Sequence, residues 1–201
     1  MIELGILADD LTGGMMVASL LEREGISCPL ISSIDELASI NDSDAQAVVV
    51  ARKIRLIAPD EARLEAVSTV KALQSIGCKR FYYKYCATFD STTDGNIGPI
   101  AEAMLETLNT EKTVFCPAFP EYTVTIFQGR MFLGSTPLGD SFKQNDPVTP
   151  MTNSNLVEVL QSQTSKHVGL ISHSMLIKEV ESVRSHINKI CLLYTSPSPR
   201  D

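Results

Sequence analysis

Polar and charged side chains follow several apolar runs of this sequence, at the points where the runs end. Two adjacent carboxylates and a threonine follow the first run, in Asp9-Asp10-Leu11-Thr12-Gly13-Gly14, and a cationic segment, Arg52–Arg55, follows a second. The segments Thr88–Asn96 and Pro117–Glu121 follow two more. Carboxylates accept hydrogen bonds from sugar hydroxyls, an arginine binds a carboxylate through two bonds, and glycine-rich helix starts favour anions. Together these residue types suit a small polyhydroxy acid.

Each of these residues also has a simpler structural interpretation. Asp10 could be a helix cap and nothing more, and Lys84 in FYYKY could be a strand residue reaching solvent. Ser91–Thr93 and Asp94-Gly95-Asn96 could form turns. A carboxylate beside a substrate hydroxyl could instead act as the base that orients it for attack.

The adjacent acids Asp9 and Asp10 are expected to have different roles. Neighbouring side chains at the end of a strand point in opposite directions. We therefore expect one acid to face the ligand and the other to hold the loop or cap the helix. Gly13 and Gly14 are assigned to close approach of the substrate.

The elements that must position these loops alternate between strands and helices. Strands are predicted at residues 2–7, 45–51, 80–85, 113–116 and 168–171, and helices at 14–24, 59–76, 100–108 and 153–163. This order predicts an α/β fold with a three-layer, open, mostly parallel, Rossmann-like sheet and helices on both faces. Ligands bind such sheets beyond the carboxyl ends of the strands. Residues 118–152, punctuated by Pro and Gly, predict a long loop or small hairpin insertion.

The composition bounds the class of protein. Of 201 residues, 44% are hydrophobic and 20% charged, as in ordinary globular proteins, and the net charge of −7 argues against a nucleic-acid partner. No apolar run approaches the ~18 residues of a membrane helix, and no signal peptide is recognised. We therefore expect no membrane partner and a cytoplasmic location. The five cysteines form no C-x-x-C pair, which predicts reduced, mostly buried thiols.

Several catalytic patterns are missing from the sequence. There is no G-x-x-x-x-G-K-[ST] and no G-x-G-x-x-G after a strand, so no local loop for nucleotide phosphates is predicted. His167, His173 and His186 lack metal-site spacing, and we expect them at the surface or hydrogen-bonded. No G-x-S-x-G elbow supports a serine hydrolase.

The last eleven residues, CLLYTSPSPRD, differ from the rest of the chain. They hold no periodic pattern, and they match one reading frame of a transposon-end adapter used for sequencing libraries. We therefore expect residues 191–201 to be a non-native tail and residues 1–190 to be a sugar-acid-binding domain whose natural reading frame continues. A natural disordered tail is the alternative, and a longer read of the source DNA decides between them.

At ADDLTGG and YKYCATFDSTTDGNIGP the sequence resembles the four-carbon acid sugar kinase family. The match recurs in order at CPAFPE, IFQGRMFLG, DPVTPMTNSNLVEVLQSQT and VGLIS, and covers residues 2–190. The form TFDST followed by GNIGP is more similar to the 3-oxo-tetronate kinases than to the threonate kinases. The resemblance implies an ATP-dependent kinase that phosphorylates the terminal hydroxyl of a four-carbon sugar acid. It also implies that this half binds the acid and is inactive alone, while ATP and Mg²⁺ bind mainly to a carboxyl-terminal half.

The resemblance carries functional roles onto matching positions of this chain. It implies catalytic roles for Asp10 and Asp90, and no metal ligand is assigned. The implied substrate-binding residues are Asp9, Thr12, Gly13, Arg55, Lys84, Thr88, Ser91, Thr92, Asn96 and, in the same motif, Gly98.

The chain departs from the family pattern at three places. Met16 stands where an acid is usual, Val124 where an arginine is usual, and Gln144-Asn145-Asp146 where Arg-Asn-His is common. We therefore expect weaker anion recognition from the long loop. Threonate or erythronate as substrate, a stand-alone binding module and an inactive divergent remnant remain alternatives, and no pattern predicts the oligomeric state.

Overall fold

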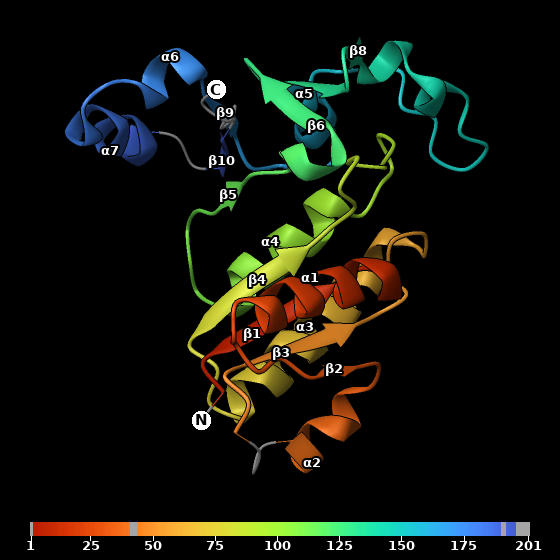
Figure 1. The fold of residues 1–201 in the computed structure, drawn as a ribbon, viewed down its shortest axis with the longest axis vertical. Coiled ribbons are helices and arrows are strands. Elements are labelled where there is room, and N and C mark those ends of the chain that lie inside the picture. The colour runs from red at the N-terminus through yellow and green to blue at the C-terminus, as the bar shows by residue number, and fades with distance from the viewer. Residues whose placement is uncertain (1, 41–43, 190–191, 196–201) are drawn as a thin grey trace. The chain divides into compact units, whose positions relative to one another are not determined.

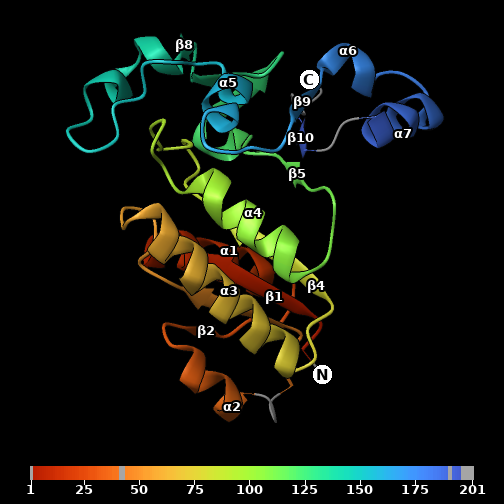
Figure 2. The same cartoon turned by 180° about the vertical axis from the view of Figure 1, so that it is seen from behind.

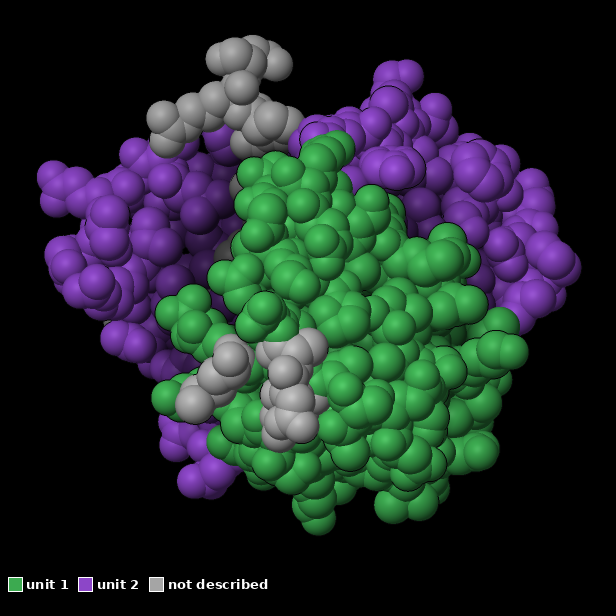
Figure 3. Space-filling model, turned by 60° about the horizontal axis from the view of Figure 1, so that its bottom comes forward, with its two compact units in different colours: residues 1–86, 99–108 green, residues 87–98, 109–201 purple. Residues whose placement is uncertain are grey.

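The computed structural model describes residues 2–40, 44–189 and 192–195, and the chain divides into two compact units (Figure 3). Unit 1 contains residues 1–86 and 99–108, and unit 2 contains residues 87–98 and 109–201. Residues 1–190, expected as one domain, are thus shared between the two units.

Unit 1 is built on a four-stranded parallel sheet in the order β2-β3-β1-β4. Its strands are β1 (Leu4–Ala8), β2 (Leu30–Ile31), β3 (Ala47–Ala51) and β4 (Arg80–Lys84). Ala8 at the end of β1 pairs with Ala51 of β3 and with Lys84 of β4. The carboxyl ends of these three strands are therefore level, and the loops that follow them start from one edge of the sheet.

Helices cover both faces of this sheet (Figures 1 and 2). Helix α1 (Leu11–Arg23) lies on one face, and α3 (Pro59–Ser75) and α4 (Ile97–Thr107) lie on the other. Alternate residues of β1 serve the two faces: Ile6 packs in the cluster that includes Ala18 of α1, and Leu7 in the cluster that includes Ala66 and Ile100. The predicted α/β fold, a parallel sheet flanked by helices, is confirmed.

The strand predicted from AQAVVVA is the most deeply buried element of the sheet. All five residues of β3 are buried, because β3 lies between β1 and β2 and is covered on both faces. An unbroken β-branched run is typical of such a strand.

The segment between α1 and β3 holds elements that no pattern predicted. A 3-10 helix, η1 (Ile34–Glu36), leads into the short helix α2 (Leu37–Ile40). Ser33 and Glu36 form a capping box at the start of η1, which satisfies two backbone donors there. Leu37 then packs in the apolar cluster that contains Ile31 of β2.

Unit 2 contains two three-stranded sheets. The parallel sheet has the order β5-β10-β9, from β5 (Val114–Phe115), β9 (Val168–Ile171) and β10 (Leu192–Thr195). The antiparallel sheet contains β6 (Val124–Phe127), β7 (Arg130–Leu133) and β8 (Thr136–Pro137). The helices of this unit are η2 (Pro120–Tyr122), η3 (Leu138–Asp140), η4 (Phe142–Asn145), α5 (Leu156–Gln161), α6 (His173–Leu176) and α7 (Val180–Lys189).

The predicted hairpin insertion is formed by β6 and β7. Their two-residue turn is Gln128-Gly129, with φ of 51° and 79°. Positive φ at both turn residues matches the right-handed twist of the strands, and glycine adopts it at little cost.

The expectation of one parallel sheet is wrong in detail. The strands β5 and β9 pair with β10 and not with β1, β3 or β4. An apolar run predicts that a strand forms but does not identify its partner. The segment Pro117–Glu121 therefore follows a strand of a different sheet from the other three polar loops.

Three predicted helix starts are also displaced, and one of them is that of α4, which begins at Ile97 and not at Ile100. Helix α1 begins at Leu11 and not at Gly14, because Asp10 caps it. Helix α5 is capped by Asn155, whose Oδ1 accepts from the N–H of Val157 at 3.2 Å, and not by Asn153-Ser154.

Part of the expected non-native tail is described. Residues 192–195 form β10, while Cys191 and residues 196–201 lie outside the described residues. That the tail is non-native stays a prediction.

The cysteines and histidines follow the sequence analysis in part. Cys28 and Cys78 are buried, and burial raises the pKa of both thiols to about 11, whereas Cys116 is exposed. His167 is exposed, and His186 Nε2 lies 3.1 Å from the carbonyl oxygen of Leu170. Within the described part of the chain, every helix is too short or too polar to cross a membrane.

Close packing of α1 on β3 predicts the effect of enlarging Gly14. A Cβ there would lie 2.9 Å from Cβ of Ala51 and 3.3 Å from Cγ1 of Val49, so the helix must shift. Overpacking costs about 1–3 kcal/mol, which the better helix propensity of alanine, about 1 kcal/mol, offsets only in part. We expect Gly14→Ala to lower the urea midpoint of unfolding.

Ser19, on the exposed side of the same helix, provides the control. Ser19→Ala gains propensity without new contacts and should leave the midpoint unchanged or slightly raised. Equal or higher stability of Gly14→Ala would contradict the packing role of Gly14.

Candidate functional site

Asp9 and Arg55 form a two-pronged ion pair at the sheet edge of unit 1. The Asp9 side chain is 1% exposed and follows β1 directly. Arg55, in the segment after β3, donates from Nε to Oδ2 at 3.1 Å and from Nη2 to Oδ1 at 2.7 Å. A bidentate pair of this kind is strong and fixes the plane of the guanidinium.

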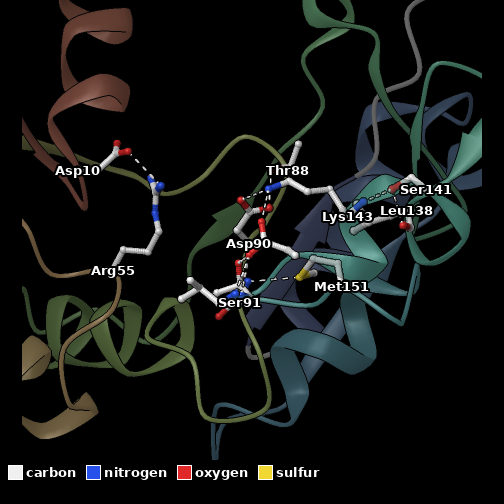
Figure 4. Close-up of polar contacts among 12 residues, drawn as sticks. Asp10, Arg55, Thr88, Asp90, Ser91, Leu138, Ser141, Lys143 and Met151 are labelled. Carbon is white, nitrogen blue, oxygen red and sulfur yellow. Dashed lines mark hydrogen bonds and ion pairs between the residues drawn. The ribbon is translucent and has the colours of Figure 1, made fainter.

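Asp10 caps a helix and is also the more exposed of the two acids. Its Oδ1 accepts from the N–H of Gly13 at 2.7 Å and caps α1. Its Oδ2 lies 3.0 Å from Nη1 of Arg55, and its side chain is 30% exposed (Figure 4). The accessible carboxylate is therefore that of Asp10, while Asp9 holds Arg55.

Lys84 completes the unit 1 group. The interpretation of Lys84 as a strand residue reaching solvent is wrong, since it is buried and its Nζ donates to the carbonyl oxygen of Tyr85. The N–H of Asp9 bonds to the carbonyl oxygen of Lys84 at 3.0 Å, so β1 and β4 stay paired up to the first acid. Gly13 at the start of α1 lies against the same lysine, since a Cβ there would be 3.4 Å from its Nζ.

Burial sets the charge properties of this group. It raises the pKa of Asp9, although the hydrogen bond and charge of Arg55 act in the opposite direction. Burial also lowers the pKa of Lys84, against the charge of Asp9. For Arg55 burial is opposed by Asp9, whose hydrogen bond and charge raise its pKa. Carboxylates and cations thus neutralise one another away from water, at an edge where a ligand oxygen could be received.

In unit 2, Asp90 is held by donors on both carboxylate oxygens (Figure 4). The hydroxyl of Thr88 donates to Oδ1 at 2.5 Å, and Nζ of Lys143 donates to Oδ2 at 2.5 Å. The side chains of Asp90 and Lys143 are each 14% exposed. The carboxylate therefore has a fixed orientation, and each oxygen keeps a lone pair for a further donor.

The backbone around Asp90 is strained. Phe89 has a φ of 58°, in the left-handed region that side chains other than glycine rarely adopt. Its ring is fully buried and meets Phe115 edge to face, with centroids 6.5 Å apart. Such strain costs about 1–3 kcal/mol, and strained residues are found more often than elsewhere in ligand-binding segments. The buried ring keeps Thr88 and Asp90 in this conformation.

Lys143 is a site residue that sequence reasoning missed. It precedes Gln144-Asn145-Asp146, where the loss of an arginine predicted weaker anion recognition. The loop nevertheless delivers a cation, which binds Asp90 and, at 3.3 Å, Oδ2 of Asp146. Burial lowers the pKa of Lys143, but the two carboxylates outweigh it and raise that pKa. Bonds from the N–H groups of Thr149 and Val148 lower the pKa of Asp146 to about 2.

Ser91 and Thr92 line a cavity of about 390 Å³ in unit 2. Thr152, Asn153 and Ser162 contribute further polar groups to its wall. The predicted turn forms here, since the N–H of Gly95 bonds to the carbonyl oxygen of Thr92 at 3.0 Å. Thr92 and Thr93 belong to this turn, and Ser91, Thr92 and Thr93 all line the cavity.

The predicted site residues fall into two groups, one in each unit. Unit 1 holds Asp9, Asp10, Thr12, Gly13, Arg55 and Lys84, and unit 2 holds Thr88, Asp90, Ser91, Thr92, Asn96 and Gly98. Thr12 is exposed in the first turn of α1, whereas Asn96 is buried. The roles of all these residues in substrate binding stay predictions.

The profile of a family described as a sugar-binding N-terminal domain matches residues 4–193. The chain belongs to this family. As a sugar-binding N-terminal domain, it is 44% identical over 187 residues to a 3-oxo-tetronate kinase of Pseudomonas fluorescens and 41% identical to one of Burkholderia multivorans. Each match covers 93% of the chain but only 44% and 43% of the relative. The domain therefore spans less than half the length of these curated relatives.

Solved structures share the fold of this sugar-binding domain. A Haemophilus influenzae protein of the DUF1537 family is 33% identical, with a TM-score of 0.86 over 96% of the chain and 48% of that protein. A Bordetella bronchiseptica domain, solved as a domain-swapped dimer with bound citrate, is 23% identical, with a TM-score of 0.79. This match covers 96% of the present chain and 47% of the Bordetella chain. At this identity the second likeness concerns the fold alone.

The buried pair of Asp9 and Arg55 predicts a pH-dependent stability defect. In Arg55→Met the carboxylate of Asp9 keeps its burial but loses the guanidinium, so its folded-state pKa rises further above the ordinary 3.8. Leaving a buried charge unpaired costs about 3–5 kcal/mol. The folded state then holds a proton that the unfolded state releases, so the defect grows as pH rises above about 4.

Urea unfolding at pH 4, 6 and 8 measures this defect. We expect the smallest difference from the wild type at pH 4 and the largest at pH 8. The double variant Asp9→Asn/Arg55→Met is compared with Asp9→Asn, and because both lack the titrating carboxyl, the difference between these two should not change with pH. A defect of the same size at all three pH values in the single variant would show that packing, and not charge, is lost.

Proposed function

We propose that this chain is the substrate-binding half of an ATP-dependent kinase that phosphorylates the terminal hydroxyl of a four-carbon sugar acid, most closely 3-oxo-tetronate. One observation carries the proposal: 44% identity to a 3-oxo-tetronate kinase over 93% of this chain but 44% of that protein. Threonate and erythronate are the alternative substrates. A cytoplasmic location is part of the same proposal.

The chemistry of the two groups of residues supports this substrate class. Unit 1 carries cations at its sheet edge, with Arg55 and Lys84 beside Asp10. Unit 2 carries a cavity with hydroxyl groups and the oriented carboxylate of Asp90. Cations recognise the carboxylate of a sugar acid, and carboxylates and hydroxyls recognise its polyol portion.

Within this proposal the chain binds and orients the acid, and Asp90 is the candidate acceptor of a proton from the substrate hydroxyl. Phosphoryl transfer depends mainly on positioning and on neutralising charge around the phosphates. ATP with Mg²⁺ supplies the phosphoryl group and that neutralisation. Among the residues that the structure describes, no three or more His, Cys, Asp or Glu side chains form a group that could hold a metal ion. In this proposal the nucleotide binds mainly to the part of the relatives that this chain does not match.

A calorimetric titration tests the proposal. The 201-residue chain is titrated with 3-oxo-tetronate, threonate, erythronate and, as a control without hydroxyls, butyrate. We expect saturable binding of the hydroxylated acids, tightest for 3-oxo-tetronate, and none of butyrate. With ATP and Mg²⁺ added, the chain alone should form no phosphorylated acid. Absence of binding by any hydroxylated acid would refute the proposal, and phosphorylation would refute the division of labour.

Asp90 provides the sharpest variant. Asp90→Asn keeps the shape of the side chain but removes the charge that orients Lys143 and accepts from a hydroxyl. We expect the dissociation constant for the preferred acid to rise at least ~10-fold, the size of one charge-assisted hydrogen bond.

Asp94 is the matched control, an exposed aspartate in the same loop. Asp94→Asn should bind as the wild type does. If both variants bind normally, Asp90 does not contact the substrate.

A further inference from the structure

Gln163 connects the segment after α5 to residues 91–98, about seventy residues earlier in the chain. These residues, called the 91–98 loop below, include the first two residues of α4. Its Nε2 donates to Oγ of Ser91 and to the carbonyl oxygen of Thr92, each at 2.7 Å. Its Oε1 accepts from the N–H of Gly98 at 3.0 Å. Both N–H groups and the oxygen of this one amide are thus used on a single loop.

The partners of Gln163 fix which way its amide lies. A backbone N–H can only donate and a backbone carbonyl can only accept. Because Gly98 presents the first and Thr92 the second, the oxygen and nitrogen of the amide have one arrangement that satisfies both. The remaining N–H then meets the hydroxyl of Ser91, which can accept it.

The loop backbone is packed tightly against Gln163. A Cβ on Gly98 would lie 2.6 Å from the carbonyl oxygen of Gln163 and 2.7 Å from its Cβ, closer than atoms approach. A Cβ on Gly95 would lie 1.8 Å from Oγ of Ser91 and 3.0 Å from Nε2 of Gln163. The two glycines of the D-G-N-I-G run are therefore required by this contact.

Two of the three bonds end on residues that line the 390 Å³ cavity. Gln163 is not itself part of the lining, so it acts on the cavity through Ser91 and Thr92. The wall contains no lysine, arginine or histidine. Its one carboxylate, Glu158, is engaged by amide groups of Asn153 at 2.8 Å and Asn155 at 2.7 Å. Hydroxyl and amide groups without a cation suit the polyol portion of a ligand and not a phosphate or carboxylate.

A second glutamine performs the local structural task. Gln161 donates from Nε2 to the carbonyl oxygens of Thr164 at 3.2 Å and Lys166 at 3.0 Å, and its Oε1 accepts from the N–H of Val168 at 3.0 Å. These bonds hold the connection between α5 and β9. Gln163 makes the same number of bonds but directs them all to residues 91–98.

We propose that Gln163 is a positioning residue that holds the 91–98 loop in the form in which Ser91 and Thr92 line a cavity for the hydroxyl groups of the sugar acid. This inference rests on the proposed function and deepens it. It assigns the polyol portion of the substrate to this cavity.

The test compares Gln163→Met with Gln161→Met. Each variant keeps the length of the side chain and loses three hydrogen bonds, so both should lower the melting temperature. Only Gln163→Met should raise the dissociation constant for 3-oxo-tetronate, by at least ~10-fold in calorimetry. Gln163→Met should also raise the rate of amide hydrogen exchange at Gly95 and Gly98, whereas Gln161→Met should leave those two rates unchanged. Wild-type binding by Gln163→Met would overturn the proposal.

Gln163→Glu adds a pH readout and a second variant, should the first fail to fold. Ionised glutamate cannot donate to Thr92, whereas protonated glutamate regains one donor. Its affinity for the sugar acid should therefore improve from pH 8 to pH 5 relative to the wild type, and a constant ratio would count against the proposal. If the wild type itself binds no acid, the proposed function fails, and hydrogen exchange alone decides whether Gln163 holds the loop.

Discussion

The pairing of Asp9 with Arg55 is the constraint on which the sheet edge of unit 1 depends. A carboxylate that is 1% exposed is costly unless a cation and hydrogen bonds satisfy it. Arg55 satisfies both oxygens, and it can do so only if the segment after β3 turns toward the end of β1. The same guanidinium also reaches Asp10 at 3.0 Å. One arginine thus fixes two loops and the start of α1.

Unit 2 follows the same principle with a different cation. Lys143 lies between Asp90 and Asp146, and backbone N–H groups hold Asp146 in turn. The strained φ of Phe89 persists because its buried ring and these bonds act together. In both units a carboxylate in a loop is ordered by a cation from a distant segment. A loop ordered in this way changes little when a ligand arrives, which lowers the entropy cost of binding.

The sequence was sufficient where the signal is local. The run AQAVVVA predicted the buried strand β3, and a helix cap was one of the two interpretations that the residue type of Asp10 allowed. It was insufficient where the partner is distant. Lys143 and Asp90 are 53 residues apart, Gln163 and Ser91 are 72 apart, and no periodicity links them. The predicted single sheet was wrong for the same reason, since β5 has only two residues and pairs with a strand near the end of the chain.

The charged groups that each unit carries bear on which group of a sugar acid that unit binds under the proposed function. The departures at Gln144 and Asp146 remove an arginine from the long loop, and the cation that remains, Lys143, is neutralised by two carboxylates. The cavity beside it has a wall without cations. Under the proposed function this cavity of unit 2 recognises hydroxyl groups. Arg55 and Lys84 belong to unit 1, where the pKa of Lys84 is already lowered by burial. An arriving carboxylate would favour the charged form of that lysine, so binding and protonation there are coupled.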